Sequence, residues 1–338
     1  MSSTLPDNRH YVAAEKQLIV PLGSDTESLH ELFRFRFGTP AIQDTASINV
    51  KLTPAANQSV ETVWLTGSSV KTRQSGSLQF AECDDFQFVT CNIDLSNKDI
   101  STAVEAAYSE ILTATATNHY PNAVRAWNYF PEINRGAGDL ESYRQFTVGR
   151  ADAFKKAGIS APNVPAATTI GTRTDQLLQI IMLFSKTSAT NIENERQTSA
   201  YHYPREYGPV SPAFSRASLI KHATANLLFV SGTASIVGSE SQHSGDFDKQ
   251  LQETLANLQA LVSKSGWNRD ALCRSISPLF TVYIRNDADL NATESSIRET
   301  FGMDSRIICL HGDICRSELL IEIEGIFWFQ QDDMQTSR

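Results

Sequence analysis

The sequence predicts an α+β protein built from two copies of one βαβαββ unit, each a mixed sheet with helices packed on one face. Three observations support this fold class. The chain has 338 residues, of which 41% are hydrophobic and 20% charged, a composition typical of globular proteins and a length sufficient for one large domain or two of ordinary size. Apolar residues recur with helical spacing in separate segments, and short β-type runs stand between them. These segments follow the same order in both halves of the chain.

The second half of the chain shows the repeating unit more clearly. Its first strand covers residues 227–237, where an apolar run is interrupted at Gly232. Residues 246–264 have the spacing of an amphipathic helix. Residues 280–284 are β-branched and aromatic, which favours a strand. The unit then continues with a helix at 292–300 and strands at 306–310 and 319–329.

The first half can be laid beside this unit element by element. Its expected strands cover 86–93, 125–130, 166–170 and 177–184, and its expected helices cover 99–115 and 140–157. One further strand precedes each unit, at 63–65 and at 217–220. A duplicated α+β unit is the economical explanation, although any two α+β halves can be matched loosely. We therefore expect an N-terminal domain over residues 1–200 and a C-terminal domain over residues 201–338.

The segment between the units, residues 185–216, has little periodicity. It contains Tyr201-His202-Tyr203-Pro204-Arg205-Glu206-Tyr207-Gly208-Pro209, which is too aromatic for a simple spacer. Loops rich in Tyr and Arg usually contact something. The contact here is either a ligand or the seam between the two halves.

The overall charge and the missing motifs exclude several classes of protein. A net charge of -9 and a pI near 5.3 argue against a nucleic-acid surface, which needs a basic face. No apolar run reaches the roughly 20 residues of a membrane span, and no signal-peptide pattern follows the polar N-terminus. The five cysteines show no CxxC spacing, so we expect neither a disulfide framework nor a zinc site. We expect a cytoplasmic protein without a metal or cofactor, since nucleotide-binding, HExxH and GxSxG motifs are missing.

Three segments of the second unit resemble the Rid/YjgF superfamily, whose fold is also described as chorismate-mutase-like. They are Ser231-Gly232-Thr233-Ala234-Ser235, the helical stretch 250–258, and Ile321-Glu322-Ile323-Glu324-Gly325. The resemblance implies a duplicated Rid/YjgF fold, and members of that superfamily form trimers that bind small carboxylates between subunits. It also implies that an arginine of the penultimate strand and the first glutamate of the closing motif face the ligand. The matching residues are Arg306, at a spacing longer by one residue, and Glu322.

The whole chain resembles a narrower group, the chorismatase family of secondary metabolism. Four segments carry this resemblance, in order: residues 125–134, 143–150, 203–209 and 313–322. The resemblance implies an enzyme that removes pyruvate from chorismate. Because one chain holds two fused units, we expect a monomer with its site between the halves; a trimer is the alternative.

Chorismate carries two carboxylates, and guanidinium groups bind carboxylates bidentately while staying charged. The candidate substrate-binding arginines are Arg144, Arg150 and Arg205, with Arg306, Arg135 and Arg216 in reserve. Arg205 lies between Tyr203 and Tyr207, which would restrict its loop, and Tyr203 joins the binding set. For any one of these arginines, an ordinary ion pair at the surface or between domains is the alternative.

Cleaving an enol ether requires a proton donor that stays protonated near neutral pH, which desolvation in an apolar site can provide. Strand alternation places Glu322 and Glu324 on one face of the apolar segment 319–328. Two acids there are expensive to bury without a purpose, although an exposed strand face with surface acids is the alternative. The matching strand at 178–184 has no acid, which predicts one working site. The family resemblance implies that Glu322 protonates the enolpyruvyl group.

The resemblance also bears on the product. In chorismatases, a cysteine seven residues before this glutamate and a glycine in the first strand accompany 3-hydroxybenzoate formation through an arene oxide. Alanine at both places accompanies hydrolysis to a dihydroxycyclohexadiene carboxylate. Cys315 and Gly232 match the first pattern, although Cys315 could equally be a small buried apolar residue.

Other activities stay open at this point. Within the family, a subfamily that also yields 4-hydroxybenzoate is an alternative, as is the hydrolytic reaction. From other classes, the alternatives are a Rid-like deaminase of enamines or imines and a non-catalytic protein that binds a small carboxylate.

Overall fold

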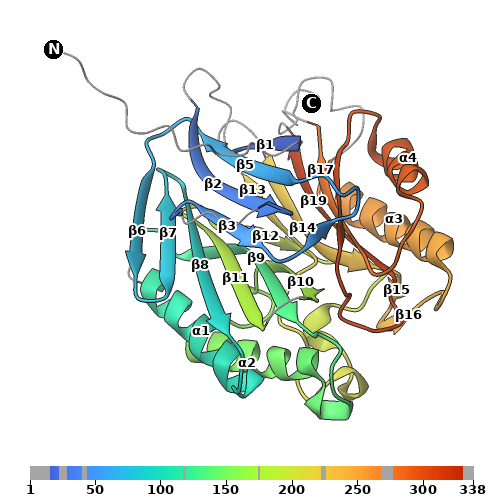
Figure 1. The fold of residues 1–338 in the computed structure, drawn as a ribbon, viewed down its shortest axis with the longest axis horizontal. Helices are drawn as coiled ribbons and strands as arrows, with labels where there is room; N and C mark the ends of the chain where they lie inside the picture. The colour runs from blue at the N-terminus through green and yellow to red at the C-terminus, as the bar shows by residue number, and fades with distance from the viewer. Residues whose placement is uncertain are drawn as a thin grey trace, which may run out of the picture.

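The computed structural model describes residues 16–22, 29–39, 44–116, 119–173, 176–221, 226–267 and 277–329. Within these ranges the chain forms three larger sheets that share one core, and helices cover two of the sheets from outside (Figure 1). The N-terminal residues on which the signal-peptide prediction rests lie outside the described residues. None of the helices in the described ranges is long and apolar enough to cross a membrane.

The first unit follows the predicted order of elements. Its strands are β7 (Leu78–Glu82), β8 (Phe86–Asp94), β9 (Asn122–Pro131), β10 (Ala166–Thr172) and β11 (Leu177–Ser185), and its helices are α1 (Ile100–Ala116) and α2 (Ser142–Lys156). The strands pair in the order β10-β9-β11-β8-β7, and β6 (Lys71–Ser75) extends the sheet beyond β7. Both helices bury apolar side chains such as Tyr108, Ile111 and Phe146 against one face of this sheet.

The second unit repeats this arrangement. Its strands are β13 (Ala217–Lys221), β14 (Asn226–Ala234), β17 (Leu279–Ile284), β18 (Arg306–His311) and β19 (Ile321–Phe329), and its helices are α3 (Phe247–Lys264) and α4 (Leu290–Phe301). They pair in the order β13-β14-β19-β17-β18, with β12 (Thr190–Ile192) and β4 (Thr53–Pro54) at the two edges. Aspartates cap both helices: Asp246 accepts from the backbone N of Lys249 at 3.1 Å, and Asp289 from that of Ala292 at 3.0 Å. The identical strand order confirms the predicted α+β duplication.

The two units also share their register. Tyr129 of β9 stands opposite Gln179 of β11, as Tyr283 of β17 stands opposite Glu322 of β19. The hydroxyls of the two tyrosines lie 3.5 Å apart in the shared core. Gln179 therefore occupies in the first unit the place of Glu322 in the second. Its buried side-chain amide donates to the backbone oxygen of Asn49 at 3.0 Å, so this position holds chain segments together.

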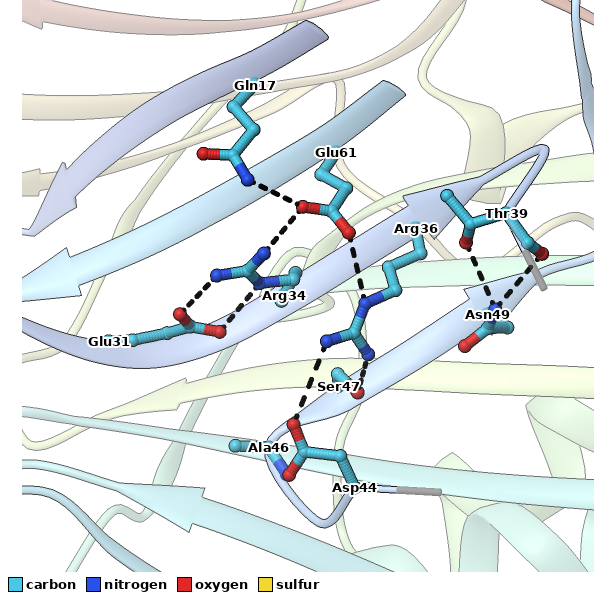
Figure 2. A network of polar contacts seen from close by, with 10 residues as sticks. All are labelled: Gln17, Glu31, Arg34, Arg36, Thr39, Asp44, Ala46, Ser47, Asn49 and Glu61. Carbon is cyan, nitrogen blue, oxygen red and sulfur yellow. Dashed lines mark hydrogen bonds and ion pairs between the residues drawn. The ribbon is translucent and has the colours of Figure 1, made fainter. Parts of the chain in front are cut away.

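The third sheet comes from the N-terminal region and has no helical layer among the described residues. Its strands are β1 (Lys16–Leu22), β2 (His30–Phe37), β3 (Ser47–Val50) and β5 (Val60–Thr66), in the order β1-β5-β2-β3. Alternation along β2 sends Phe33 and Phe35 into the shared core. The opposite face carries the network of Figure 2, in which Glu61 accepts from Arg34 at 2.5 Å and from Arg36 at 3.1 Å.

One detail of the predicted duplication was wrong. Residues 63–65, expected as the strand ahead of the first unit, belong to β5 of the third sheet. The strand beside β8 is β7, which forms a hairpin with the fully exposed strand β6. A short buried apolar run predicts a strand but does not reveal its neighbour.

Candidate active site

A cavity of about 380 Å³ lies between the two units. Side chains of β10 from the first unit and of β14 and β19 from the second line it, and the backbone N of Ala167 ties these walls together by donating to Ser231 Oγ at 2.9 Å. Residues of α2, of the segment 203–216 and of the loop before β19 complete the lining. The lining residues are Glu141, Tyr143, Arg144, Arg150, Ala167, Thr169, Tyr203, Glu206, Tyr207, Pro212, Phe214, Arg216, Gly232, Ala234, Ile236, Cys315, Arg316, Ser317, Glu318 and Glu322.

Glu322 is a buried acid of this cavity. On β19 it stands between Ala234 of β14 and Tyr283 of β17, and only 5% of its surface is exposed. Burial, followed by the negative charge of Glu324, raises the pKa of Glu322 from 4.5 to about 8. Glu322 is therefore mostly protonated at neutral pH and can act as a proton donor there.

Glu324 lies on the same face of β19 and is held in a buried polar network. Its Oε2 lies 2.6 Å from Nη2 of Arg125, and its Oε1 accepts from Trp127 Nε1 at 3.1 Å. Arg125 also donates to Thr168 Oγ1, which accepts from the backbone N of Gly232 at 2.9 Å. The network thus links Glu324 to β14, the strand that lies beside Glu322.

Gly232 borders Glu322 directly. A Cβ added to Gly232 would lie 1.9 Å from Oε1 of Glu322 and 3.1 Å from the methyl group of Thr168. Any side chain at this position would compete with the carboxyl group for the same space. The sequence predicted that Gly232 borders the substrate, and the structure shows that it borders the acid.

Cys315 lies in the loop between β18 and β19 and lines the cavity. Burial, followed by the charge of Glu322, raises the pKa of Cys315 to about 12. The thiol is therefore neutral at physiological pH, and it is a poor nucleophile because the reactive form is the thiolate.

Two buried arginines of the cavity have nitrogens without a hydrogen-bond partner in the described part of the chain. Arg150 of α2 is 1% exposed, and none of its three guanidinium nitrogens has such a partner. The Tyr108 hydroxyl, which donates to Asn128 Oδ1 at 2.6 Å, interacts with Arg150 both through its charge and as a side-chain hydrogen-bond partner, so within the described residues the nitrogens of Arg150 lack a well-aligned partner and a carboxylate, not every polar neighbour. Arg216 donates to Tyr203 Oη at 2.7 Å, while its Nε stays unpartnered. Buried cations of this kind are unfavourable unless a ligand neutralises them.

Arg144 and Tyr203 complete the predicted residues that reach the cavity. Nε of Arg144 donates to Glu141 Oε2 at 3.0 Å, so its charge is already paired. Tyr203 is buried and holds Arg216 through its hydroxyl. Seven of the nine predicted site residues therefore meet at one place: Glu322, Cys315, Gly232, Tyr203, Arg144, Arg150 and Arg216.

The structure does not bring Arg205 into the cavity. Its side chain is 65% exposed and pairs with Asp139, with Nη2 2.5 Å from Oδ2. The two residues that follow it line the cavity instead. Arg135, a reserve candidate, is also exposed and pairs with Glu132 at 2.6 Å. Tyrosines on both sides of an arginine do not determine which way a loop side chain points.

Arg306 is also outside the cavity. It lies on β18 and donates to the backbone oxygen of Ser277 at 2.8 Å. The cavity uses β10, the corresponding strand of the first unit, where the shared register places Ala166 at the position of Arg306. The predicted arginine therefore sits on the wrong copy of the repeat.

Sequence reasoning missed Arg316. Its guanidinium lies 3.9 Å from the ring centre of Tyr207 and 5.3 Å from that of Tyr203, and it donates to Ser239 O at 2.8 Å. Its position next to Cys315, inside a segment that carries the family resemblance, was the available signal. Tyr143 was missed as well, and burial raises the pKa of its hydroxyl well above the usual range.

The cavity thus combines a protonated buried acid with several guanidinium groups that lack a carboxylate partner in the described ranges. Guanidinium groups attract a small anionic substrate, and the acid can protonate it. These features define the candidate site of an acid-catalysing enzyme for a small carboxylate.

Comparisons with known proteins identify the family. Residues 62–184 match the family described as chorismatase FkbO/Hyg5-like, N-terminal. The chain is 34% identical to a 3-hydroxybenzoate synthase of Streptomyces hygroscopicus over 278 residues, 78% of this chain and 80% of that protein. It is 31% identical to a chorismatase of Streptomyces rapamycinicus over 284 residues, 82% of this chain and 85% of that protein. A chorismatase crystal structure superposes with a TM-score of 0.76 and 28% identity, covering 91% of this chain and 96% of that one.

The chain belongs to the chorismatase family. This confirms the resemblance that four sequence segments suggested, and it makes the protein an enzyme of this type.

Proposed function

We propose that this enzyme converts chorismate into pyruvate and 3-hydroxybenzoate, with Glu322 as the proton donor. The observation that carries the proposal is the pKa of Glu322, raised to about 8 inside a cavity that also presents arginines without a carboxylate partner in the described part of the chain. The 3-hydroxybenzoate synthase that is 34% identical to this chain supports the identity of the product.

The arginines account for the binding of a dianion. Arg150 reaches the cavity from α2 of the first unit, while Arg216 comes from the segment before β13 and Arg316 from the loop before β19. The charge of Arg216 is felt at Glu322, so we assign the pyruvyl carboxylate to Arg216 and the ring carboxylate to Arg150. This orientation brings the enol-ether methylene close to the proton of Glu322.

The reaction then needs no water. Glu322 transfers its proton to the terminal methylene carbon of the enol ether, which becomes the methyl group of pyruvate. The ring hydroxyl attacks the neighbouring carbon, the bond from that carbon to the pyruvyl oxygen breaks, and pyruvate leaves with this oxygen. The ionised Glu322 accepts the hydroxyl proton, and the resulting arene oxide opens and loses a ring proton to become 3-hydroxybenzoate.

Cys315 and Gly232 support the aromatic product over hydrolysis. The Cys315 side chain lines the cavity and is larger than the alanine that accompanies hydrolysis in the family, so it leaves less room for an attacking water molecule. Gly232 leaves room for the carboxyl group of Glu322. Formation of a dihydroxycyclohexadiene carboxylate, or of 4-hydroxybenzoate beside the 3-isomer, is the alternative outcome.

Incubation with chorismate in deuterated water tests this proposal. We expect pyruvate and 3-hydroxybenzoate in equal amounts, with one deuterium in the methyl group of each newly formed pyruvate. Glu322→Gln should lose activity by roughly 100- to 10,000-fold, the usual contribution of a general acid. Unchanged pyruvate release by Glu322→Gln would falsify the assignment of the acid, and a diol product would reject the proposed route.

We also propose that the enzyme works as a monomer, because residues from both units of one chain line the same cavity. Light scattering coupled to size-exclusion chromatography, run on active fractions, measures this directly. Activity confined to a trimer fraction would contradict it.

A further inference from the structure

The loop between β18 and β19 forms one wall of the cavity without being a helix or a strand. It supplies Cys315, Arg316, Ser317 and Glu318 to the lining. This loop is partly buried, and its inward-facing backbone oxygens need hydrogen-bond partners from outside the segment. Those partners determine where the side chains of the loop stand.

Arg285, immediately after β17, provides most of these partners. Its Nε donates to Leu319 O at 2.8 Å, and its Nη2 donates to Ile314 O at 2.8 Å and Arg316 O at 3.0 Å. Its Nη1 donates to Asp313 Oδ1 at 3.0 Å. One guanidinium group thus contacts both ends and the middle of the loop.

Asn134 completes the set from the other unit. It lies in the turn after β9, and its Nδ2 donates to Cys315 O at 3.2 Å. Its Oδ1 accepts from Arg285 Nη2 at 3.1 Å. The two side chains together hold the three consecutive backbone oxygens of residues 314–316, and neither of them lines the cavity.

We propose that Arg285 and Asn134 are positioning residues that fix the Cys315 loop, and that this fixing sets how chorismate is divided between 3-hydroxybenzoate and other products. The inference rests on the proposed function of the cavity. Water and the ring hydroxyl of the substrate are the competing oxygen nucleophiles of the proposed reaction. Because a displacement of about 1 Å in an active site can change a rate about 100-fold, a small shift of the Cys315 side chain is enough to admit water or to reorient the ring.

The chemistry of the guanidinium group makes the proposal testable. Arginine presents five N–H donors in a planar fork, whereas lysine presents three on one nitrogen. Arg285→Lys keeps the positive charge near Asp313 but cannot reach both ends of the loop. Asn134→Ala removes only the contact from the first unit.

The test measures pyruvate release and the ratio of 3-hydroxybenzoate to the other products, 4-hydroxybenzoate and diol, in Arg285→Lys and Asn134→Ala. We expect 3-hydroxybenzoate to lose about two- to tenfold against the other products in each variant, the effect of losing about one hydrogen bond. The ratio does not depend on how much of a variant is folded. If Arg285→Lys does not fold, Asn134→Ala carries the test.

Arg173→Lys is the matched control. Arg173 shares Asp313 Oδ1 with Arg285, donating to it at 2.9 Å, and it also donates to the backbone oxygen of Arg285. It is exposed, however, and touches none of the loop's backbone oxygens that Arg285 holds. We expect its product ratio to equal that of the unchanged enzyme.

The outcomes separate this inference from the proposed function. An unchanged enzyme that releases no pyruvate from chorismate overturns the proposed function itself. An active enzyme whose Arg285→Lys and Asn134→Ala variants keep the original ratio overturns the positioning role, even where total turnover falls.

Discussion

Gly232 on β14 and Glu322 on β19 share one space, because a Cβ at Gly232 would lie 1.9 Å from the carboxyl oxygen of Glu322. This separation is far below van der Waals contact. The missing side chain on one strand therefore determines where the acid on the neighbouring strand can stand. A glycine in a strand interior often marks such a close approach.

We predict that Gly232→Ala lowers the rate of 3-hydroxybenzoate formation by at least about tenfold, since misplacing a catalytic group by about 1 Å can lower the rate far more. The measurement is the steady-state formation of 3-hydroxybenzoate. Thermal unfolding of the variant should show a folded protein, because the Glu322 side chain can rotate away from the added methyl group.

A double-variant cycle identifies the cause of that loss. If Gly232→Ala acts by displacing the acid, it should have little further effect in a Glu322→Ala background, where no carboxyl group remains. Equal fractional losses in both backgrounds would show that Gly232 acts independently of Glu322.

We predict that Glu322→Gln makes the protein more stable while it inactivates the enzyme. The folded-state pKa of about 8 lies above the usual 4.5, so the unfolded chain ionises first as the pH rises. The stability contributed by protonated Glu322 is complete below about pH 4.5 and is lost as the pH rises through 8. A neutral amide avoids that loss, and we expect a gain of about 2–5 kcal/mol at pH 8 in denaturant titrations.

Glu324→Gln is the matched control, because it is the same substitution two residues away on the same strand face. It leaves Arg125 buried without its carboxylate partner, and we expect it to destabilise the protein by about 3–5 kcal/mol. If both substitutions stabilised the protein, or both destabilised it, the distinct roles of Glu322 and Glu324 would be contradicted.

We also predict that Glu324→Gln changes the pH dependence of the reaction. Activity requires protonated Glu322, so kcat/KM should fall as the pH rises through about 8. Removing the negative charge of Glu324 lowers the pKa of Glu322, and the uncompensated Arg125 lowers it further. The fall in kcat/KM should therefore begin at a lower pH in the variant.

The control for this shift is Glu318→Gln. Glu318 lines the cavity, where its Oε1 accepts from Ser241 Oγ at 2.7 Å. We expect its pH profile to follow that of the unchanged enzyme. If kcat/KM of Glu324→Gln fell at the same pH as that of the unchanged enzyme, burial alone would account for the raised pKa of Glu322.

The residues that the sequence predicted well are those whose direction follows from a repeating backbone. Strand alternation placed Glu322 and Glu324 on one face, and the structure confirms that both are buried. Helical and strand periodicity predicted the order of both units. These patterns are local, so they can be read from a single sequence.

The residues that the sequence predicted poorly are those whose position depends on nonlocal geometry. Arg306 occupies the expected strand, but the cavity forms on the matching strand of the other unit. Arg205 and Arg316 both lie outside regular strands and long helices. No periodicity indicates that Arg316 points into the cavity while Arg205 points to the surface. The support of the Cys315 loop by Arg285 and Asn134 crosses between units, which a sequence pattern does not reveal.

The final prediction concerns Arg150, a buried arginine that has no carboxylate partner among the described residues. A buried cation kept for a ligand destabilises the empty protein, so Arg150→Met should raise the melting temperature of the ligand-free enzyme. The same variant should raise KM for chorismate roughly 100-fold, because it removes a buried charged hydrogen-bonding group. Arg306→Met, outside the cavity, is the matched control and should leave KM unchanged. If Arg150→Met kept the original KM, the ring carboxylate would have to bind elsewhere in the cavity.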